Sequence, residues 1–248
     1  MIEILPISGL PIFKKSDDIG QIIVEHFGQS LRDGDVLIVT SKIVSKAEGL
    51  EIDSATISPS PFATFIAERG QKDPKQVELI LQESKTIVRM SDTLLIAETH
   101  HGFICANAGV DRSNARPGHL LLLPRSPDAS AAAIRSRILE LTGLSNIAVI
   151  ISDTFGRPFR VGTTNVAIGV AGMDPLEDYR GRPDIYGYVL QHTVVARADE
   201  LASAAGLVLG QAAERVPVAV IRGFSVTPTE DPVSARDLIR KREEALFW

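Results

Sequence analysis

Residues 147–160 read I-A-V-I-I-S-D-T-F-G-R-P-F-R and join an apolar run to a group of polar side chains. The five consecutive apolar residues 147–151 are too few for an ordinary helix and predict a strand that is buried on both faces. Ligands of open α/β sheets bind where strands end. Ser152, Asp153 and Thr154 come at the carboxyl end of this strand, and the Asp-Thr pair has carboxylate and hydroxyl oxygens that suit a hard cation.

Two arginines, Arg157 and Arg160, continue the same segment and suit phosphate or carboxylate oxygens. Cation and anion ligands within eight residues favour a functional site. The structural alternative is a strand followed by a Gly-Pro turn, in which Asp153 caps the turn and the arginines are solvated.

Composition narrows the class of protein. The chain has 248 residues, enough for one large domain or two small ones, and a net charge of −5 without a basic block, which argues against nucleic-acid binding. Its longest apolar runs are shorter than a membrane span, and the amino terminus lacks a secretion-signal pattern. The single cysteine, Cys105, excludes an intrachain disulfide and fits a reducing compartment, so we expect a cytoplasmic protein without a membrane partner.

Lysines with helical spacing follow a second buried strand, 36–39. In T-S-K-I-V-S-K-A-E-G, residues 40–49, Lys42 and Lys46 lie four positions apart and share one face of a helix, with Ser41 and Ser45 on the adjoining face. A basic phosphate-binding face and an exposed basic helix end are equally consistent with this pattern.

An amino-terminal turn resembles a phosphate loop but departs from it. Residues 9–16 read G-L-P-I-F-K-K-S, close to G-x-x-x-x-G-K-S, yet Lys14 stands where the second glycine must curl around a phosphate. We therefore do not predict a phosphate loop here, although this turn could contact a nucleotide through its backbone.

Polar residues crowd the segment 99–114, T-H-H-G-F-I-C-A-N-A-G-V-D-R-S-N. Asp111 and Asn114 offer a carboxylate and an amide at short spacing, which suits a hard metal and a ligand. Adjacent histidines such as His100 and His101 point in different directions and are more often solvated than metal-bound. The alternative is a polar surface loop.

The order of elements predicts an α+β fold with mixed sheets and flanking helices, because strands and helices are interspersed without a regular βαβ period. We expect a single domain over 1–248, with two subdomains as the alternative, and an amphipathic terminal helix over 235–247 that ends in aromatic residues. The other predicted helices cover 17–29 (capped by Ser16), 61–69, 74–84, 127–141 and the segment after 194; a long turn-rich loop covers 174–187.

Several long motifs in one order resemble the coenzyme F420-0:L-glutamate ligase family, also called the F420 γ-glutamyl ligase family. They are G-D-V-L-I-V-T-S-K-I-V-S-K-A-E-G (34–49), H-G-F-I-C-A-N-A-G-V-D-R-S-N (101–114), I-S-D-T-F-G-R-P-F-R (151–160), V-A-I-G-V-A-G (166–172), D-Y-R-G-R-P-D-I-Y-G (178–187) and A-D-E-L-A (198–202). The resemblance runs from the first strand to about residue 223. Some actinobacterial members carry a second, reductase-like domain, and we expect the stand-alone form here.

The resemblance implies a GTP-dependent ligase that adds L-glutamate to the side-chain carboxylate of F420-0 and then γ-linked glutamates. It also implies two divalent cations, Mg²⁺ or Mn²⁺, an effect of K⁺, and an intertwined homodimer. By resemblance, Asp111 and Asp153 ligate one metal, and Thr154 with Gln211 the second; Asp111, Asp153 and Lys46 are the expected catalytic residues. The nucleotide contacts that it implies are Gly9, Leu10, Pro11, Ile12, Ser41, Lys42, Lys46 and Asn114.

Other functions stay open on the sequence alone. A related metal-dependent amide ligase for another carboxylate, a non-catalytic nucleotide-binding regulator and a metal phosphohydrolase are the alternatives. Arg157, Arg160, Arg180 and Arg182 are candidates to hold an anionic coenzyme by charge alone, or to form salt bridges at a dimer interface. No N-K-x-D guanine-reading motif is present, so GTP is expected from the resemblance only.

Overall fold

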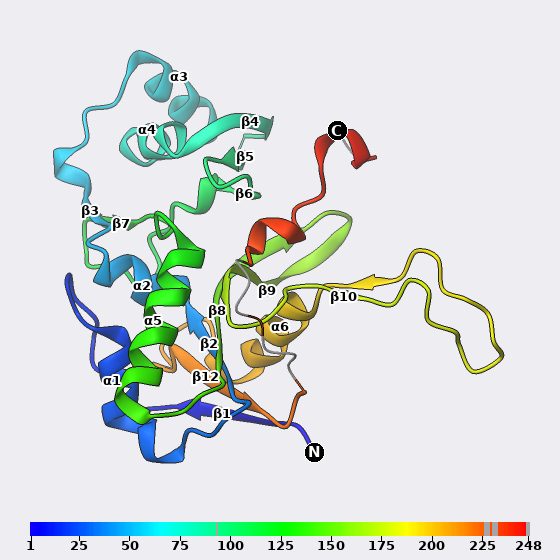
Figure 1. Ribbon diagram of the computed structural model, residues 1–248. Coiled ribbons are helices and arrows are strands. Elements are labelled where there is room, and N and C mark those ends of the chain that lie inside the picture. Colours follow the sequence, from blue (N-terminus) through cyan, green and yellow to red (C-terminus); the bar gives the residue numbers. More distant parts are fainter. Residues whose placement is uncertain (93, 226–228, 230–232, 247–248) are drawn as a thin grey trace.

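A mixed five-stranded sheet lies at the centre of the protein (Figure 1). The computed structural model describes residues 1–92, 94–225, 229 and 233–246. Neighbouring strands of this sheet are antiparallel except β2 and β8, which are parallel and therefore need a long crossover between them. The predicted α+β class with mixed sheets is confirmed. In sheet order the strands are β1 (Glu3–Ile7), β12 (Val218–Arg222), β2 (Val36–Thr40), β8 (Ala148–Arg157) and β9 (Arg160–Ala171).

Helices cover both faces of this sheet. Leu37 and Val39 of β2 pack in one core cluster with residues of α1 and α5, whereas Val36 and Ile38 pack in a second cluster with residues of α6. Because side chains alternate along a strand, a strand covered on both faces must be apolar throughout. This confirms the buried strand expected at 147–151. The helices are α1 (Ile19–Phe27), α2 (Ser41–Ala47), α5 (Pro127–Thr142) and α6 (Arg197–Leu209).

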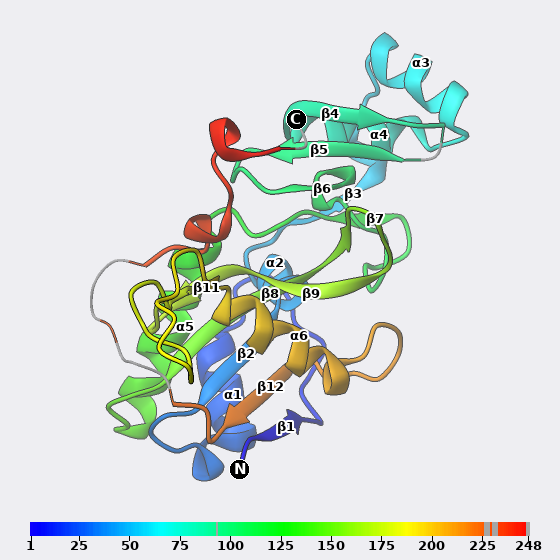
Figure 2. The same ribbon diagram turned by 90° about the vertical axis from the view of Figure 1, so that its right-hand side faces the viewer.

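A third core cluster belongs to the crossover between β2 and β8. Its buried residues run from Leu50 to Leu122 and come from two helices and short strands. Figure 2 shows these elements beyond one end of the five-stranded sheet. They are β3 (Glu51–Asp53), α3 (Pro61–Gly70), α4 (Pro74–Gln82), β4 (Ser84–Met90), β5 (Leu95–Thr99), β6 (Ile104–Ala106) and β7 (His119–Leu121), with 3₁₀ turns at Ser54–Thr56 and Asn107–Gly109.

β8 is longer than the strand that the apolar run 147–151 predicts. β8 continues through Asp153 and Thr154 to Arg157, and β9 returns from Arg160 as an antiparallel hairpin partner. The sequence prediction that these polar residues follow the strand is therefore wrong. Cross-strand hydrogen bonds to β9 keep the backbone extended where the side chains become polar.

Two predicted helices also differ from the structure. The helix expected at 17–29 is α1 followed by a separate 3₁₀ turn, Gly28–Ser30, and its cap is Asp18, which accepts a hydrogen bond from the Gln21 N–H, instead of Ser16. Ser16 has φ 71°, a left-handed conformation that cannot begin a helix.

The helix expected at 235–247 is replaced by two 3₁₀ turns, Ala235–Leu238 and Arg242–Glu244. The backbone is extended at Ile239 between them, with φ −83° and ψ 120°. Asp128 holds the start of this segment through Ser234 and the Ala235 N–H. Leu238 and Ile239 pack against the core clusters, and such tertiary packing decides the conformation of a short segment. Phe247 and Trp248 lie outside the described residues.

The turn-rich loop expected at 174–187 overlaps an arm, residues 179–193, that projects from the sheet (Figure 1). Its base is closed by β10 (Glu177–Asp178), which pairs with β11 (Val194–Val195). The arm carries exposed apolar side chains, including Ile185 and Tyr186, each 90% exposed. Within the described part of the chain, no helix is long and apolar enough to span a membrane.

The edge strand β9 is held by the first turns of two helices. The Ala167 N–H donates to Asp199 of α6 and the Val170 N–H to Asp128 of α5. A Cβ atom at Gly169 would lie 2.5 Å from the backbone of Pro127, the first residue of α5. This close approach leaves no room for a side chain at residue 169.

We expect Gly169→Ala to lower the free energy of unfolding by about 1–3 kcal/mol, because the added methyl group must displace the start of α5. Urea denaturation measures the change. Gly156→Ala on β8 is the matched control, since a Cβ there has no atom within 4 Å. Equal stability of the two variants would contradict the packing argument.

Candidate functional site

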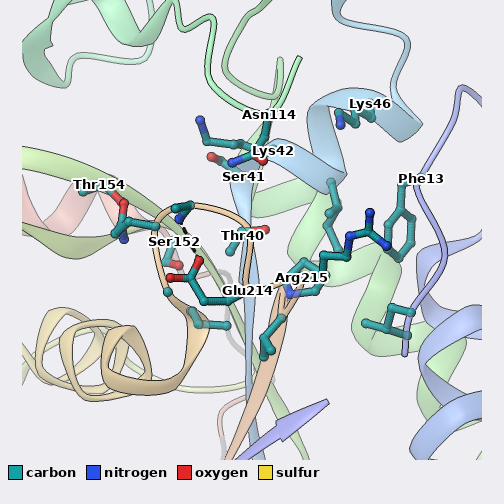
Figure 3. A pocket seen from close by; sticks show the side chains of 18 of the residues that line it. Phe13, Thr40, Ser41, Lys42, Lys46, Asn114, Ser152, Thr154, Glu214 and Arg215 are labelled. Carbon is teal, nitrogen blue, oxygen red and sulfur yellow. Dashed lines mark hydrogen bonds between the residues drawn. The ribbon is translucent and has the colours of Figure 1, made fainter. Parts of the chain in front are cut away.

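A cavity of about 560 Å³ opens beside the end of β2, where α2 begins (Figure 3). Its walls come from separate parts of the chain: the amino-terminal turn, the β2–α2 junction, the loop that holds Asn114, the middle of β8, Asn165 of β9 and the loop after α6. Ten of the predicted site residues line it: Leu10, Pro11, Ile12, Ser41, Lys42, Lys46, Asn114, Asp153, Thr154 and Gln211.

The β2–α2 junction supplies two positive charges to the cavity, Lys42 and Lys46. The helix begins directly after the strand, and Figure 3 shows Ser41 and Lys42 near Asn114, with Lys46 one turn further along. Burial lowers the pKa of the Lys46 ammonium, an effect that the charge of Glu51 partly offsets. The structure therefore places both lysines on one wall of the cavity, as their helical spacing predicts, rather than on a solvated helix end.

Lys42 connects the cavity to Asp111. Its Nζ donates to Asp111 Oδ2 and to the Ser113 hydroxyl, and lies 3.1 Å from the Ser113 carbonyl oxygen. Burial raises the pKa of Asp111, but hydrogen bonds from Lys42 and Ser113 outweigh it and hold the pKa below its usual range. Asp111 itself is not among the described residues that line the cavity; it lies one side chain behind Lys42.

Asp153 is the most deeply placed acid of the site. Ser41 Oγ donates to Asp153 Oδ1 at 2.9 Å, across a sequence separation of 112 residues. Burial raises the pKa of this carboxyl, although the Ser41 hydrogen bond, the Thr154 N–H and the charge of Lys42 lower it. Asp153 is half-buried and lines the cavity, so its carboxylate can meet a ligand there.

The side chains of Thr154 and Gln211 are in contact at the cavity, although 57 residues separate them in the sequence. Thr154 Oγ1 donates to Gln211 Oε1 at 3.2 Å, and Gln211 Nε2 donates to Asn165 Oδ1 at 3.3 Å. Adjacent oxygens around an octahedral Mg²⁺ ion lie about 3 Å apart. The pair therefore has the donor chemistry and the spacing of two neighbouring metal ligands.

The oxygen atoms of Asp153, Thr154 and Gln211 suit a metal ion that is bound partly by the protein and partly by a substrate. Among the described residues, no three His, Cys, Asp or Glu side chains gather as a metal-binding group. Mg²⁺ in phosphate-transferring proteins is bound by one or two carboxylates and completed by water and substrate phosphates. Carboxylate, hydroxyl and amide oxygens at Asp153, Thr154 and Gln211 suit that arrangement.

The amino-terminal turn and the loop after Asp111 close the cavity. Leu10, Pro11 and Ile12 line it, whereas Gly9, in a left-handed conformation with φ 79°, precedes the lining residues. Asn114 also has a positive φ, 58°, which turns its loop toward Lys42.

The four candidate arginines are absent from the described residues that line the cavity. Arg180 pairs with Asp178 at 2.6 Å and Arg182 with Glu177 at 3.1 Å, both at the base of the arm. Arg157 donates to the Val161 carbonyl oxygen within its own hairpin. The structure gives these three side chains local partners, and their link to an anionic coenzyme stays a prediction.

Sequence reasoning missed several lining residues: Phe13, Thr40, Ser152, Asn165, Glu214 and Arg215. Ser152 and Asn165 are buried polar residues. Asn165 directly precedes the apolar run 166–171, and a polar residue in that place could have indicated a site residue. Its position opposite Thr154 depends on the β8–β9 register, which the sequence does not give. Glu214 and Arg215 follow the end of α6, where sequence periodicity stops.

Cys105 lies close enough to this site for the charge of Asp153 to act on its thiol. It is buried, and burial together with the charge of Asp153 raises the pKa of its thiol to about 12. A thiol with this pKa is protonated at neutral pH.

We expect the Cys105 thiol of the folded protein to react with a disulfide reagent at pH 8 at least about tenfold more slowly than in the urea-unfolded chain, because reaction requires the thiolate. Absorbance of the released chromophore measures both rates. Equal rates would mean that Cys105 is accessible and ionised.

The protein has an α+β fold and a cavity lined by lysines and by side chains with oxygen atoms of the kind that bind hard cations. This combination suits molecules that contain phosphate. The family model described as F420-0:Gamma-glutamyl ligase matches residues 9–223. The chain therefore belongs to the F420-0:γ-glutamyl ligase family.

Proteins named coenzyme F420:L-glutamate ligase are similar over nearly the whole chain. The protein of Methanothermobacter thermautotrophicus is 47% identical over 249 residues, which cover 99% of this chain and 98% of that protein. Those of Methanopyrus kandleri and Methanocaldococcus jannaschii are 46% and 45% identical, over 98% and 96% of this chain and 97% and 94% of theirs.

Proposed function

We propose that this protein is a ligase that uses GTP to join L-glutamate to the side-chain carboxylate of coenzyme F420-0 and then adds γ-linked glutamates, with release of GDP and phosphate. The observation that carries the proposal is the convergence of Lys42, Lys46, Asp153, Thr154 and Gln211 on one cavity in a chain of this family. The names of its relatives supply the substrates, since each is called a coenzyme F420:L-glutamate ligase.

The proposed reaction has two steps. A carboxylate oxygen of F420-0 attacks the γ-phosphorus of GTP, and the bond from that phosphorus to the bridging oxygen breaks, which gives an acyl phosphate and GDP. The glutamate amine then attacks the acyl carbon, phosphate leaves, and the amine loses a proton. Nearly all of the help that such phosphoryl transfer needs is positioning and charge stabilisation.

The residues of the cavity have matching roles in this proposal. Lys42 and Lys46 face the phosphates and stabilise their charge. Asp111 holds the Lys42 ammonium in place, and Asp153, with Asp111, would hold one divalent cation. Thr154 and Gln211 would hold the second cation. When bound, Mg²⁺ or Mn²⁺ neutralises phosphate charge and polarises the γ-phosphoryl group; K⁺ is a further expected activator.

The nucleotide is proposed to contact the turn at 9–12 and the β2–α2 junction. Leu10, Pro11 and Ile12 line the same cavity as Ser41, Lys42 and Asn114, so one ligand can reach all of them. Gly9, with its positive φ, lets the turn bend toward the cavity. Preference for GTP over ATP is tested by comparing the two nucleotides as co-substrates.

We expect the purified protein, incubated with F420-0, L-glutamate, GTP and Mg²⁺, to produce a mass ladder in which each product is heavier by one glutamate residue. Liquid chromatography with mass spectrometry detects the products, and phosphate release is followed in parallel. A non-catalytic regulator predicts unchanged F420-0, and a phosphohydrolase predicts GTP hydrolysis without acceptors. An amide ligase for another carboxylate predicts no ladder from F420-0.

Asp153→Asn is the matching loss-of-function variant in this assay. Removal of the buried negative charge should lower the rate about 100-fold or more, because the cation and its phosphate ligand lose a fixed partner. Asp53→Asn is the control, since Asp53 is exposed, caps a 3₁₀ turn outside the cavity lining, and asparagine caps equally well. Full activity of Asp153→Asn would refute the metal assignment.

We also propose the homodimer that is expected for the family. The β8–β9 hairpin ends in Phe159 and Val161, 87% and 98% exposed, and the arm adds Ile185 and Tyr186. Large apolar side chains gathered on projecting segments are typical of surfaces that are covered in an assembly.

We expect sedimentation velocity to give the mass of a dimer for the wild-type protein and a shift toward the monomer for Val161→Glu, because a charge buried at an apolar contact is costly. Circular dichroism checks that the variant is folded. A wild-type monomer at micromolar concentration would contradict the proposed dimer.

A further inference from the structure

Asn165 is a buried polar residue on β9 whose side chain reaches the cavity. The residue is 6% exposed and lies directly opposite Thr154 in the β8–β9 register. Its Oδ1 accepts a hydrogen bond from Gln211 Nε2 at 3.3 Å, and its Nδ2 lies 3.5 Å from Ser152 Oγ. Buried amides keep such partners because an unpaired amide is costly.

This contact fixes which end of the Gln211 amide faces Thr154. An amide has an acceptor oxygen and a donor nitrogen that differ little in shape, so its orientation depends on its hydrogen bonds. With Nε2 bonded to Asn165 Oδ1, Gln211 turns Oε1 toward Thr154 Oγ1 at 3.2 Å. Only the oxygen can ligate a hard cation.

Gly206 of α6 leaves room for this arrangement. A Cβ atom at that position would lie 3.1 Å from Asn165 Oδ1 and 3.3 Å from its Cγ. Ser203, one turn earlier on the same helix, donates to the Asn165 carbonyl oxygen at 2.8 Å. The packing of α6 on β9 therefore sets both the backbone and the side chain of Asn165.

We propose that Asn165 is a positioning residue that presents the Gln211 carbonyl oxygen to a divalent cation beside Thr154. The role rests on the proposed function, because it requires Gln211 to be a metal ligand. Asn165 acts through Gln211 and does not itself ligate the ion. Partners that orient metal ligands contribute to metal affinity without touching the metal.

The test is Mn²⁺ binding to the full chain with GDP present, measured from the electron paramagnetic resonance signal of free Mn²⁺ and corrected for GDP alone. We expect Asn165→Ala to weaken binding about tenfold. Asn165→Asp should stay within about twofold of the wild type or bind more tightly, because its carboxylate still accepts from Gln211 Nε2. Equal loss in both variants would overturn the positioning role.

A double-mutant comparison separates positioning from general support of the fold. Gln211→Ala should weaken binding at least as much as Asn165→Ala, and the double variant should bind like Gln211→Ala, because the two residues act in series. Unchanged binding in Gln211→Ala would overturn the metal role of Gln211. Weakened binding in Gln211→Ala with unchanged binding in Asn165→Ala would overturn only the positioning role.

Gly206→Ala should change metal affinity and thermal stability in different directions, which separates positioning of Asn165 from support of the fold. Alanine favours a helix over glycine, so the thermal midpoint should stay or rise, while the new methyl group displaces Asn165 and weakens Mn²⁺ binding. Leu207→Ala, next in the helix and 83% exposed, is the control and should leave binding unchanged. Wild-type Mn²⁺ binding in Gly206→Ala would count against the proposed geometry.

Discussion

The parallel pairing of β2 with β8 is the contact on which the rest of the site depends. Its register places Thr40 opposite Ser152 at the centre of the sheet. Ser41, the first residue of α2, and Asp153, the next residue of β8, then form the hydrogen bond that joins the lysine-bearing helix to the buried acid. A shift of one residue would turn the polar side chains to the other face of the sheet and remove the site.

Charge in the cavity is arranged around that pairing. Lys42 acts on two carboxylates: it donates to Asp111, and its charge lowers the pKa of Asp153. The charge of Asp111 raises the pKa of Asp153, so Lys42 offsets the repulsion between the two acids.

Local sequence patterns predicted much of the fold and part of the site. The structure confirms the buried strands, the helix expected at 127–141 and the shared face of Lys42 and Lys46. The prediction of a terminal helix was wrong because tertiary packing decides the conformation of that segment. The predicted end of β8 was wrong because cross-strand hydrogen bonds to β9 extend the strand. Asn165 was missed for the same reason, since its importance comes from partners 13 and 46 residues away.

The sequence by itself determined which chemical groups were available: oxygen ligands at Asp153 and Thr154, paired lysines one helical turn apart, and apolar strands that need cover on both faces. These features follow from side-chain chemistry and from local periodicity, which each segment carries alone. Only the tertiary structure decided that the amino-terminal turn, the β2–α2 junction, β8 and the loop after α6 share one cavity. Such contacts depend on strand register and helix packing between distant segments, and local sequence patterns do not determine these.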